Sequence, residues 1–414
     1  MRRILWFAIL ILVVGACARA PTEPPIVEEG SPTPSATPAA PTPESTKPKE
    51  PTPTPESPNE LPSGARSEFE TDFRKRSVSY SEIETVLSKD RIPAIDDPTF
   101  VGVEQANEWL AEGEPVLMLE LGDTARAYPI QILMWHEIVN DTVEGTPVAA
   151  TYCPLCNTGI VFERTVDGQV LDFGTTGRLR YSNLVMYDRQ SESWWQQATG
   201  EAIAGQFTGN QLTMLPPTMI AWADFEGRYP DGRVLSRETG YERDYGRNPY
   251  TNYDDLDRSP FLYEGPATPG DLPQMARVLG VDVEGEAVAY PYGGLESARV
   301  INDAVGGVPI VVLWQPGTAS ALDAARIAEG DDVGSATALS RELDGRTLTF
   351  ALEGDRIVDE ETGSEWSFFG EAVTGPLEGR ELQPVVSVDY FWFSWAAFHP
   401  ETRVHDPDAA SADS

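Results

Sequence analysis

Short runs of apolar residues, or of alternating apolar and polar residues, recur along the chain. Gly, Pro or Asp-Gly pairs separate the runs, the first of which cover residues 115–121, 147–152, 159–164 and 170–173. Runs of this length with turn-forming residues at their ends are typical of β-strands. The pattern therefore predicts a strand-rich protein.

Two Asp-Gly pairs, at residues 167–168 and 344–345, predict tight hairpin turns between such strands. Predicted helices are few and short, and they cover residues 81–88, 219–228 and 391–398. We therefore predict a mainly β fold of the α+β class.

Much of the chain between residues 127 and 400 occurs twice. The tripeptide Ala-Tyr-Pro at residues 127–129 recurs at residues 289–291, an offset of 162. Later matches pair Asp188 with Asp359, and Trp222 with Trp392. A repeat of this length predicts two tandem copies of one β-rich unit, whose shared residues form the scaffold.

The first copy alone carries the residues that are candidates for chemistry. Its Cys153, Cys156 and His136 correspond to Gln315, Thr318 and Ala298 in the second copy.

The N-terminus has the layout of a secretory signal. Two arginines precede an apolar run at residues 4–14, which is shorter than the roughly 20 residues that span a bilayer. The following Val-Gly-Ala-Cys sequence resembles a bacterial lipobox that ends at Cys17. We predict a signal peptide at residues 1–16, lipidation of Cys17 and an extracytoplasmic protein attached to the membrane. An ordinary signal peptide with an incidental cysteine is the alternative.

Residues 17–65 form a predicted linker, because 14 of the 45 positions from residue 21 to residue 65 are proline. Such a composition cannot bury a core. Beyond the linker we predict copy one at residues 66–240, a connector at 241–275, copy two at 276–406 and a disordered tail at 407–414.

The formal net charge of −36 argues against nucleic acid as a partner, because phosphate binding depends on clustered Lys and Arg. It also argues against direct adsorption to anionic lipid, so the predicted membrane attachment depends on the lipid at Cys17.

With Cys17 assigned to the lipid, Cys153 and Cys156 are the remaining thiols. Their Cys-Pro-Leu-Cys spacing suits a redox-active disulfide or a pair of metal ligands. The motif leaves one predicted strand and precedes another, so we place it on a β-turn with Pro154 at the second position. A structural disulfide is the alternative, although closing so short a loop gains little entropy.

His136 is the predicted third member of the site, where it would polarise a thiolate, move its proton or ligate a metal. If residues 144–145 form a hairpin turn, His136 lies across from Cys153, because the two residues are equally distant from the turn. If residues 130–140 are helical instead, His136 and Asn140 share one helix face.

Between Phe173 and Asp188 the first copy is about six residues longer than the second. This extra stretch contains Arg178, Arg180 and Asn183, which are candidates for binding a small anionic substrate. Arginines that pair with nearby carboxylates are the alternative.

Five segments of the first copy form a specific combination, at residues 135–141 (WHEIVND), 151–156 (TYCPLC), 173–177 (FGTTG), 182–188 (SNLVMYD) and 200–205 (GEAIAG). Together they resemble an uncharacterised prokaryotic family known only as domain-of-unknown-function family 3179, over about residues 90–405. Some members are described as selenoproteins with selenocysteine in a Cys-Pro-x-Cys motif. The resemblance therefore implies redox chemistry at Cys153 or Cys156, and it supplies no substrate. This chain departs from the family at Asn157, where glycine is common.

Three functions remain open. The first is a thiol–disulfide or peroxide-type oxidoreductase, with Cys153 and Cys156 as attacking and resolving thiols and His136 tuning them. The second is a metal-binding module that uses the same three residues, for which a transition metal is the implied cofactor. The third is a binding lipoprotein whose cysteines form only a structural disulfide.

Overall fold

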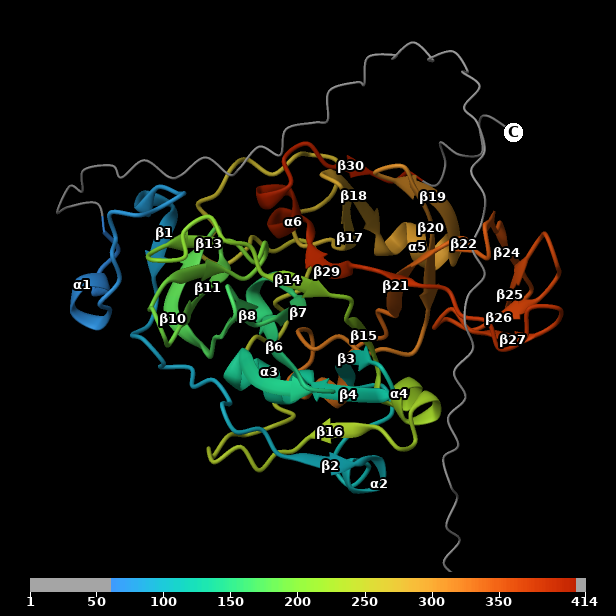
Figure 1. The fold of residues 1–414 in the computed structure, drawn as a ribbon, viewed down its shortest axis with the longest axis horizontal. Helices are drawn as coiled ribbons and strands as arrows, with labels where there is room; N and C mark the ends of the chain where they lie inside the picture. The colour runs from blue at the N-terminus through green and yellow to red at the C-terminus, as the bar shows by residue number, and fades with distance from the viewer. Residues whose placement is uncertain (1–60, 407–414) are drawn as a thin grey trace, which may run out of the picture. The chain divides into compact units, whose positions relative to one another are not determined.

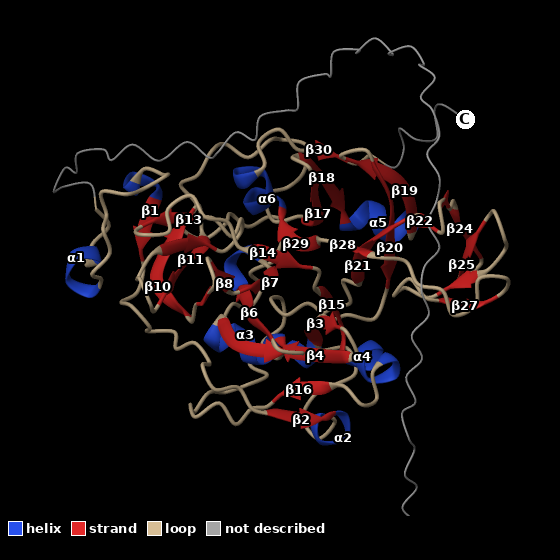
Figure 2. Cartoon of the chain, viewed as in Figure 1, coloured by secondary structure: helices blue, strands red, loops and turns tan. Residues whose placement is uncertain are grey.

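The computed structural model describes residues 61–406. The predicted signal peptide, Cys17, most of the linker and the tail at 407–414 lie outside these residues. Short strands dominate the described part, with few and short helices (Figures 1 and 2), which confirms the prediction of a mainly β protein. None of its helices is long and apolar enough to cross a membrane.

The first half contains three larger sheets, with strand orders β14-β7-β6-β5, β15-β3-β4-β16-β2 and β1-β10-β11-β12-β13, and a two-stranded sheet of β8 and β9. Neighbouring strands are antiparallel except β4 and β16. The strands are β1 (Ile83–Thr85), β2 (Phe100–Gly102), β3 (Pro115–Leu121), β4 (Thr124–Pro129), β5 (Ile138–Val143), β6 (Thr146–Cys153), β7 (Thr158–Glu163), β8 (Thr165–Val166), β9 (Gln169–Val170), β10 (Phe173–Arg180), β11 (Asn183–Asp188), β12 (Trp194–Gln196), β13 (Ala202–Ala204), β14 (Thr213–Leu215), β15 (Thr218–Ala221) and β16 (Arg233–Leu235).

The second half also contains three larger sheets, with strand orders β19-β20-β21-β28, β29-β17-β18-β30 and β24-β25-β26-β27. Its strands are β17 (Arg277–Val283), β18 (Glu286–Pro291), β19 (Val300–Val305), β20 (Val308–Gln315), β21 (Ser335–Ser340), β22 (Glu342–Leu343), β23 (Arg346–Thr347), β24 (Phe350–Glu353), β25 (Arg356–Asp359), β26 (Glu365–Trp366), β27 (Ala372–Thr374), β28 (Pro384–Val385), β29 (Ser387–Phe391) and β30 (Arg403–Val404).

The strand pairings of the second half follow those of the first. Met118 faces Ala127 across β3 and β4, and Gly280 faces Ala289 across β17 and β18, at the sequence offset of 162. Polar contacts recur as well: the indole of Trp195 donates to Asp188 over 3.0 Å, and the indole of Trp366 donates to Asp359 over 2.9 Å. Residues common to both halves therefore make structural contacts.

Helices are short throughout the described part. They are α1 (Ala65–Glu68), α2 (Val103–Ala106), α3 (Ile130–His136), α4 (Trp222–Arg228), α5 (Tyr292–Ala298) and α6 (Trp392–Phe398), with 3₁₀ turns η1 (Tyr80–Glu82), η2 (Pro154–Cys156) and η3 (Ile327–Glu329). The helices predicted at 219–228 and 391–398 are confirmed, although α4 starts at Trp222 because residues 218–221 pair with β3.

The helix predicted at residues 81–88 is wrong. Ser79 caps a single 3₁₀ turn, and the chain then extends as β1, which pairs with the end of β10. A partner strand distant in sequence therefore overrides the local preference.

The predicted hairpin turns are confirmed. Asp167 and Gly168 have φ angles of 50° and 79°, and Asp344 and Gly345 have φ angles of 52° and 75°. Both central residues are left-handed, as a type I′ turn requires.

One apolar core extends through both halves of the described chain. It joins Leu117, Tyr152 and Ile160 of the first half to Val388 and Tyr390 of the second, and it contains both cysteines. The cysteines therefore belong to the interior and not to a surface loop.

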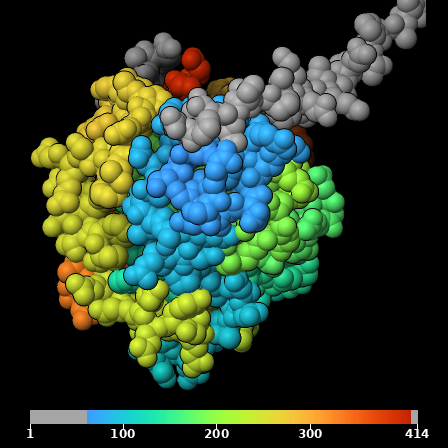
Figure 3. Space-filling view, turned by 90° about the vertical axis from the view of Figure 1, so that its left-hand side faces the viewer, coloured from blue at the N-terminus to red at the C-terminus, as the bar shows by residue number. Residues whose placement is uncertain are grey.

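The start of the described chain lies across one face of the molecule, in blue in Figure 3, with yellow segments beside it.

Candidate functional site

Cys153 and Cys156 lie on the turn between β6 and β7, as predicted. Cys153 is the last residue of β6 and pairs with Thr158, the first residue of β7. Pro154 begins the 3₁₀ turn η2, and Asn157 closes it in the left-handed conformation at φ 51°. Proline is suited to the first position of such a turn, because it has a fixed φ and no N–H to satisfy.

Both cysteines are free thiols, and their sulfurs lie 3.3 Å apart. A disulfide bond is about 2.05 Å long, so an approach of little more than 1 Å separates the dithiol from the disulfide. Each side chain is at most 2% exposed. Burial raises the pKa of the Cys153 thiol well above its ordinary value, and it is the largest cause of this shift. Contact with Cys156 and the charge of Glu137 also raise this pKa.

The β10–β11 hairpin covers the two sulfurs. It extends to the pair Arg180 and Asn183, whereas the equivalent β24–β25 hairpin stops at Glu353 and Arg356. At its tip, Tyr181 and Ser182 are both left-handed, with φ of 53° and 64°. The carbonyl oxygen of Ser182 lies 3.4 Å from Cys156 Sγ and 3.9 Å from Cys153 Sγ, where it accepts from the thiols.

Two consecutive left-handed residues other than glycine are unusual and cost roughly 1–2 kcal/mol each. Here they direct one backbone carbonyl at both sulfurs. The additional residues of this hairpin in the first half therefore build the cover of the dithiol.

Asn183, a predicted substrate-binding residue, contacts the dithiol directly. Its Nδ2 donates to Cys156 Sγ over 3.3 Å and to Gln197 Oε1 over 3.0 Å. Its Oδ1 accepts from Gln196 Nε2 over 2.6 Å and from the backbone N–H of Ala198 over 3.0 Å. All of these groups are buried, so Asn183 fixes the position of Cys156 and supplies an N–H donor to its sulfur.

Replacing Asn183 by Leu is expected to destabilise the fold strongly, because it leaves the amides of Gln196 and Gln197 and the N–H of Ala198 without these partners. Each unsatisfied buried group costs roughly 1–3 kcal/mol, so we expect the free energy of unfolding to fall by at least about 3 kcal/mol in a urea titration. Asn210→Leu is the control, since it removes a single 3.2 Å contact with Asp167 and should cost less than about 1 kcal/mol. Equal losses in the two variants would contradict this account of the network.

Glu137 is a site residue that sequence reasoning missed. It follows α3 in the left-handed conformation, at φ 58° and ψ −29°. Burial raises the pKa of its carboxyl group to about 8, and its charge acts on Cys153 and on Tyr250. Arg299 occupies the equivalent left-handed position after α5 at φ 59°. A carboxyl group in the first half where the second half has an arginine was a signal available in the sequence.

His136 does not contact the cysteines in the way that was predicted. The β5–β6 ladder reaches no further than the pair of Ile138 and Thr151. The residue before Ile138 is the left-handed Glu137, which connects β5 to the preceding helix α3, and His136 is the last residue of that helix. The alternative of a helix that includes Asn140 is also wrong, since Asn140 lies in β5.

Both ring nitrogens of His136 have other partners. Nδ1 donates to the carbonyl oxygen of Pro93 over 2.7 Å, so the neutral ring accepts at Nε2 from the Tyr245 hydroxyl, also over 2.7 Å. Burial lowers the pKa of His136, and the positive charge of Arg243 lowers it further. His136 therefore belongs to a separate polar cluster.

Arg178 and Arg180 pair with carboxylates, which is the alternative that the sequence left open. Arg178 is fully buried, and its Nη1 donates to Glu68 over 2.7 Å. Arg180 contacts Glu82 over 2.7 Å. Both guanidinium groups therefore hold a carboxylate partner within the fold.

His136 does not join the two cysteines as a third metal ligand, because both of its ring nitrogens have other partners. In the described part of the chain, no group of three or more His, Cys, Asp or Glu side chains is arranged to hold a metal ion. The reason is the orientation of His136, whose two nitrogens face Pro93 and Tyr245.

The family described as "Protein of unknown function (DUF3179)" matches residues 89–402. The chain belongs to the DUF3179 family. The matched region contains the whole dithiol site, from Glu137 to Gln197, and it extends through both halves of the fold. No curated protein and no solved structure matches the chain. Within this DUF3179 protein, the chemistry must therefore be inferred from the site itself.

Proposed function

We propose that this protein is a thiol–disulfide oxidoreductase whose redox centre is Cys153 and Cys156. The observation that supports it best is the pair of free thiols with sulfurs 3.3 Å apart on a short turn. A second support is the polar cluster around these sulfurs, because a purely structural disulfide needs neither an amide donor nor a carboxyl group of raised pKa beside it.

In the proposed reaction, one cysteine loses its proton and attacks a substrate disulfide. A mixed disulfide forms, and the first substrate thiolate leaves and takes up a proton. The second cysteine then attacks the mixed disulfide, closes the Cys153–Cys156 bond and releases the second substrate thiol. Two electrons and two protons pass from the dithiol to the substrate.

Glu137 is the proposed proton acceptor and donor for Cys153. A carboxyl group with a pKa of about 8 exchanges protons readily near neutral pH, which is the range in which a general acid or base is most effective. The Nδ2–H of Asn183 stabilises negative charge that develops on Cys156 during the exchange.

Access to the buried dithiol requires movement of the connector that covers it. The Tyr253 hydroxyl donates to the carbonyl of Leu155 over 3.1 Å, and Ser182 Oγ donates to the carbonyl of Phe261 over 2.6 Å. These contacts, together with the 2.7 Å ion pair of Asp254 with Arg277, hold residues 253–261 over the turn. We propose that this segment moves aside when a substrate disulfide binds.

The direct functional test uses oxidised glutathione as the substrate disulfide. The reduced full-length Cys17→Ser variant should release two glutathione thiols per chain and lose both alkylatable cysteines. If the chain reacts only after denaturation, the dithiol is not a redox centre in the native fold.

We further propose that the two halves arose as copies of one unit and that the second serves as scaffold. Gln315 and Thr318 replace the cysteines, and Thr318 Oγ1 bonds to Ser335 Oγ over 2.5 Å. The second half also contributes Tyr390, whose hydroxyl donates to the carbonyl of Ala198 behind the Asn183 network over 3.0 Å. The second half thereby contributes a hydrogen bond to the residues that hold the Asn183 network.

We propose that the protein acts outside the cytoplasm, attached to the membrane by a lipid on Cys17. The supports are the basic start, the short apolar run and the Val-Gly-Ala-Cys sequence. Cys17→Ser is expected to move the protein from the membrane fraction to the soluble extracytoplasmic fraction, as measured by immunoblotting. A variant that stays in the membrane fraction with unchanged mobility would refute the lipid anchor.

A further inference from the structure

We propose that a polar cavity next to His136 binds a small dianion, either a phosphate group or a dicarboxylate. The cavity has a volume of about 510 Å³, and four of its lining residues are cationic: Lys89, Arg91, Arg189 and Arg243. Two carboxylates, Asp90 and Asp96, also line it. The whole chain has 66 acidic residues and only 30 Lys and Arg, so this excess of positive charge is a local reversal.

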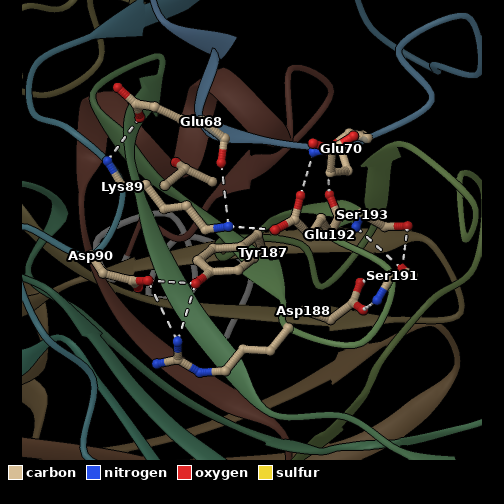
Figure 4. A network of polar contacts seen from close by, with 12 residues as sticks. Glu68, Glu70, Lys89, Asp90, Tyr187, Asp188, Ser191, Glu192 and Ser193 are labelled. Carbon is tan, nitrogen blue, oxygen red and sulfur yellow. Dashed lines mark hydrogen bonds and ion pairs between the residues drawn. The ribbon is translucent and has the colours of Figure 1, made fainter. Parts of the chain in front are cut away.

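Two of the four cations are neutralised within the fold. Lys89 Nζ contacts Glu192 Oε1 over 2.5 Å, and Arg189 lies between Asp90 and Asp96, at 3.4 and 3.1 Å. Figure 4 shows Lys89 joined to Glu192, and Asp90 joined to Tyr187, by polar contacts. The Tyr187 hydroxyl donates to Asp90 over 2.5 Å, and Lys89 lies 4.5 Å from the centre of the Tyr187 ring. This wall of the cavity is therefore held in place before any ligand binds.

The other two cations have no carboxylate partner among the described residues. Within the described part of the chain, the Arg91 side chain forms no hydrogen bond or ion pair, and the Arg243 side chain donates one hydrogen bond, from Nη1 to the neighbouring carbonyl of Glu242 over 3.1 Å. Two guanidinium groups on one cavity can each offer paired N–H donors to a phosphate or carboxylate. Phosphate and dicarboxylate share this recognition chemistry.

His136 lies behind the same cavity. Its Nδ1 donates to Pro93, a lining residue, and its ring centre lies 5.4 Å from that of Tyr241, another lining residue. A bound dianion would change the field at His136, whose ring signals therefore report binding independently of the cysteines. The site does not depend on the proposed redox function.

The test is calorimetric titration of the full-length chain with inorganic phosphate and, separately, with malonate. We expect saturable binding of one dianion per chain, weakened by added salt, and a shift of the His136 ring signals in the NMR spectrum at constant pH. The double variant Arg91→Gln and Arg243→Gln should bind at least about tenfold more weakly, because it removes charge-assisted hydrogen bonds.

Arg247→Gln is the matched control. Arg247 belongs to the same connector, is exposed and pairs at 3.8 Å with Asp244, outside the cavity, so its replacement should leave the affinity unchanged. Binding of phosphate alone would identify a phosphate site, and binding of malonate alone a carboxylate site; either supports the proposal. No saturable binding of either anion, or equal affinity in the double variant and the unmodified chain, would overturn it.

Discussion

Replacing either Cys153 or Cys156 by Ser is expected to abolish the two-electron exchange with a disulfide substrate. A single remaining thiol can form a mixed disulfide but cannot resolve it within the chain. In the Cys17→Ser background, each variant should therefore release one glutathione thiol at most and retain the other glutathione as a covalent adduct. Mass spectrometry of the intact chain measures this adduct.

The matched control for these variants is Thr318→Ser, at the position in the second half that corresponds to Cys156. It keeps the hydroxyl group that bonds to Ser335 and should leave the exchange unchanged. Full exchange in the Cys153→Ser or Cys156→Ser variant would show that other chemistry reduces the disulfide.

Replacing Glu137 by Gln should slow the exchange by roughly 100-fold at neutral pH, because a positioned acid or base contributes about 10²–10⁴-fold. In the unmodified chain, the rate should rise with pH up to about 8, where Glu137 loses its proton, and then level off. The Gln variant cannot titrate at this position and should lack that step. A stopped-flow pH profile of thiol loss distinguishes the two, and an unchanged profile would exclude Glu137 from proton transfer.

The same variant should alter the pH dependence of stability. The folded state raises the pKa of Glu137 from 4.5 to about 8, so it binds the proton more tightly than the unfolded chain does. This contribution is complete below about pH 4.5 and is lost as the pH rises to about 8, and it amounts to no more than about 5 kcal/mol. The Gln variant should keep the stability that the unmodified chain loses between pH 5 and pH 9.

Glu144→Gln is the control for that experiment. Glu144 is also a left-handed glutamate, at φ 49°, but it is exposed on the β5–β6 turn. Denaturant unfolding at pH 5 and at pH 9 measures the free energy of unfolding at each pH. The difference between the two values should be the same for Glu144→Gln as for the unmodified chain. If Glu137→Gln behaves in the same way, Glu137 is not buried in a protonated form.

Local patterns were sufficient for the strands, the turns and the position of the dithiol. The Asp-Gly pairs determine the left-handed turn residues, and alternating apolar runs determine which strands pair through them. The turn between β6 and β7 follows from Pro154 and the two strands around it. Asn183 was also predicted as a site residue, although its role is to contact Cys156 and not a bound anion.

The cover of the site could not be predicted in the same way. The group nearest both sulfurs is a backbone carbonyl, that of Ser182, and a carbonyl has no sequence signature. Its position depends on where the β10–β11 hairpin ends, which the bulge between Thr175 and Arg178 shifts. His136 was placed wrongly because equal distance from a turn implies pairing only while the ladder continues. The left-handed Glu137 interrupts the β5–β6 ladder, whose last pair, Ile138 and Thr151, lies two residues short of the pair that His136 and Cys153 would form.

The measurement that tests the central proposal most directly is a redox titration of the full-length Cys17→Ser variant in glutathione buffers of increasing oxidation, with the remaining thiols alkylated and counted. We predict one reversible two-electron transition in which Cys153 and Cys156 disappear together and return together when the buffer is made reducing. The proposal would be contradicted by a pair of thiols that stays reduced at every reduction potential of the buffer. It would also be contradicted by a Cys153–Cys156 disulfide that glutathione cannot reduce in the native fold.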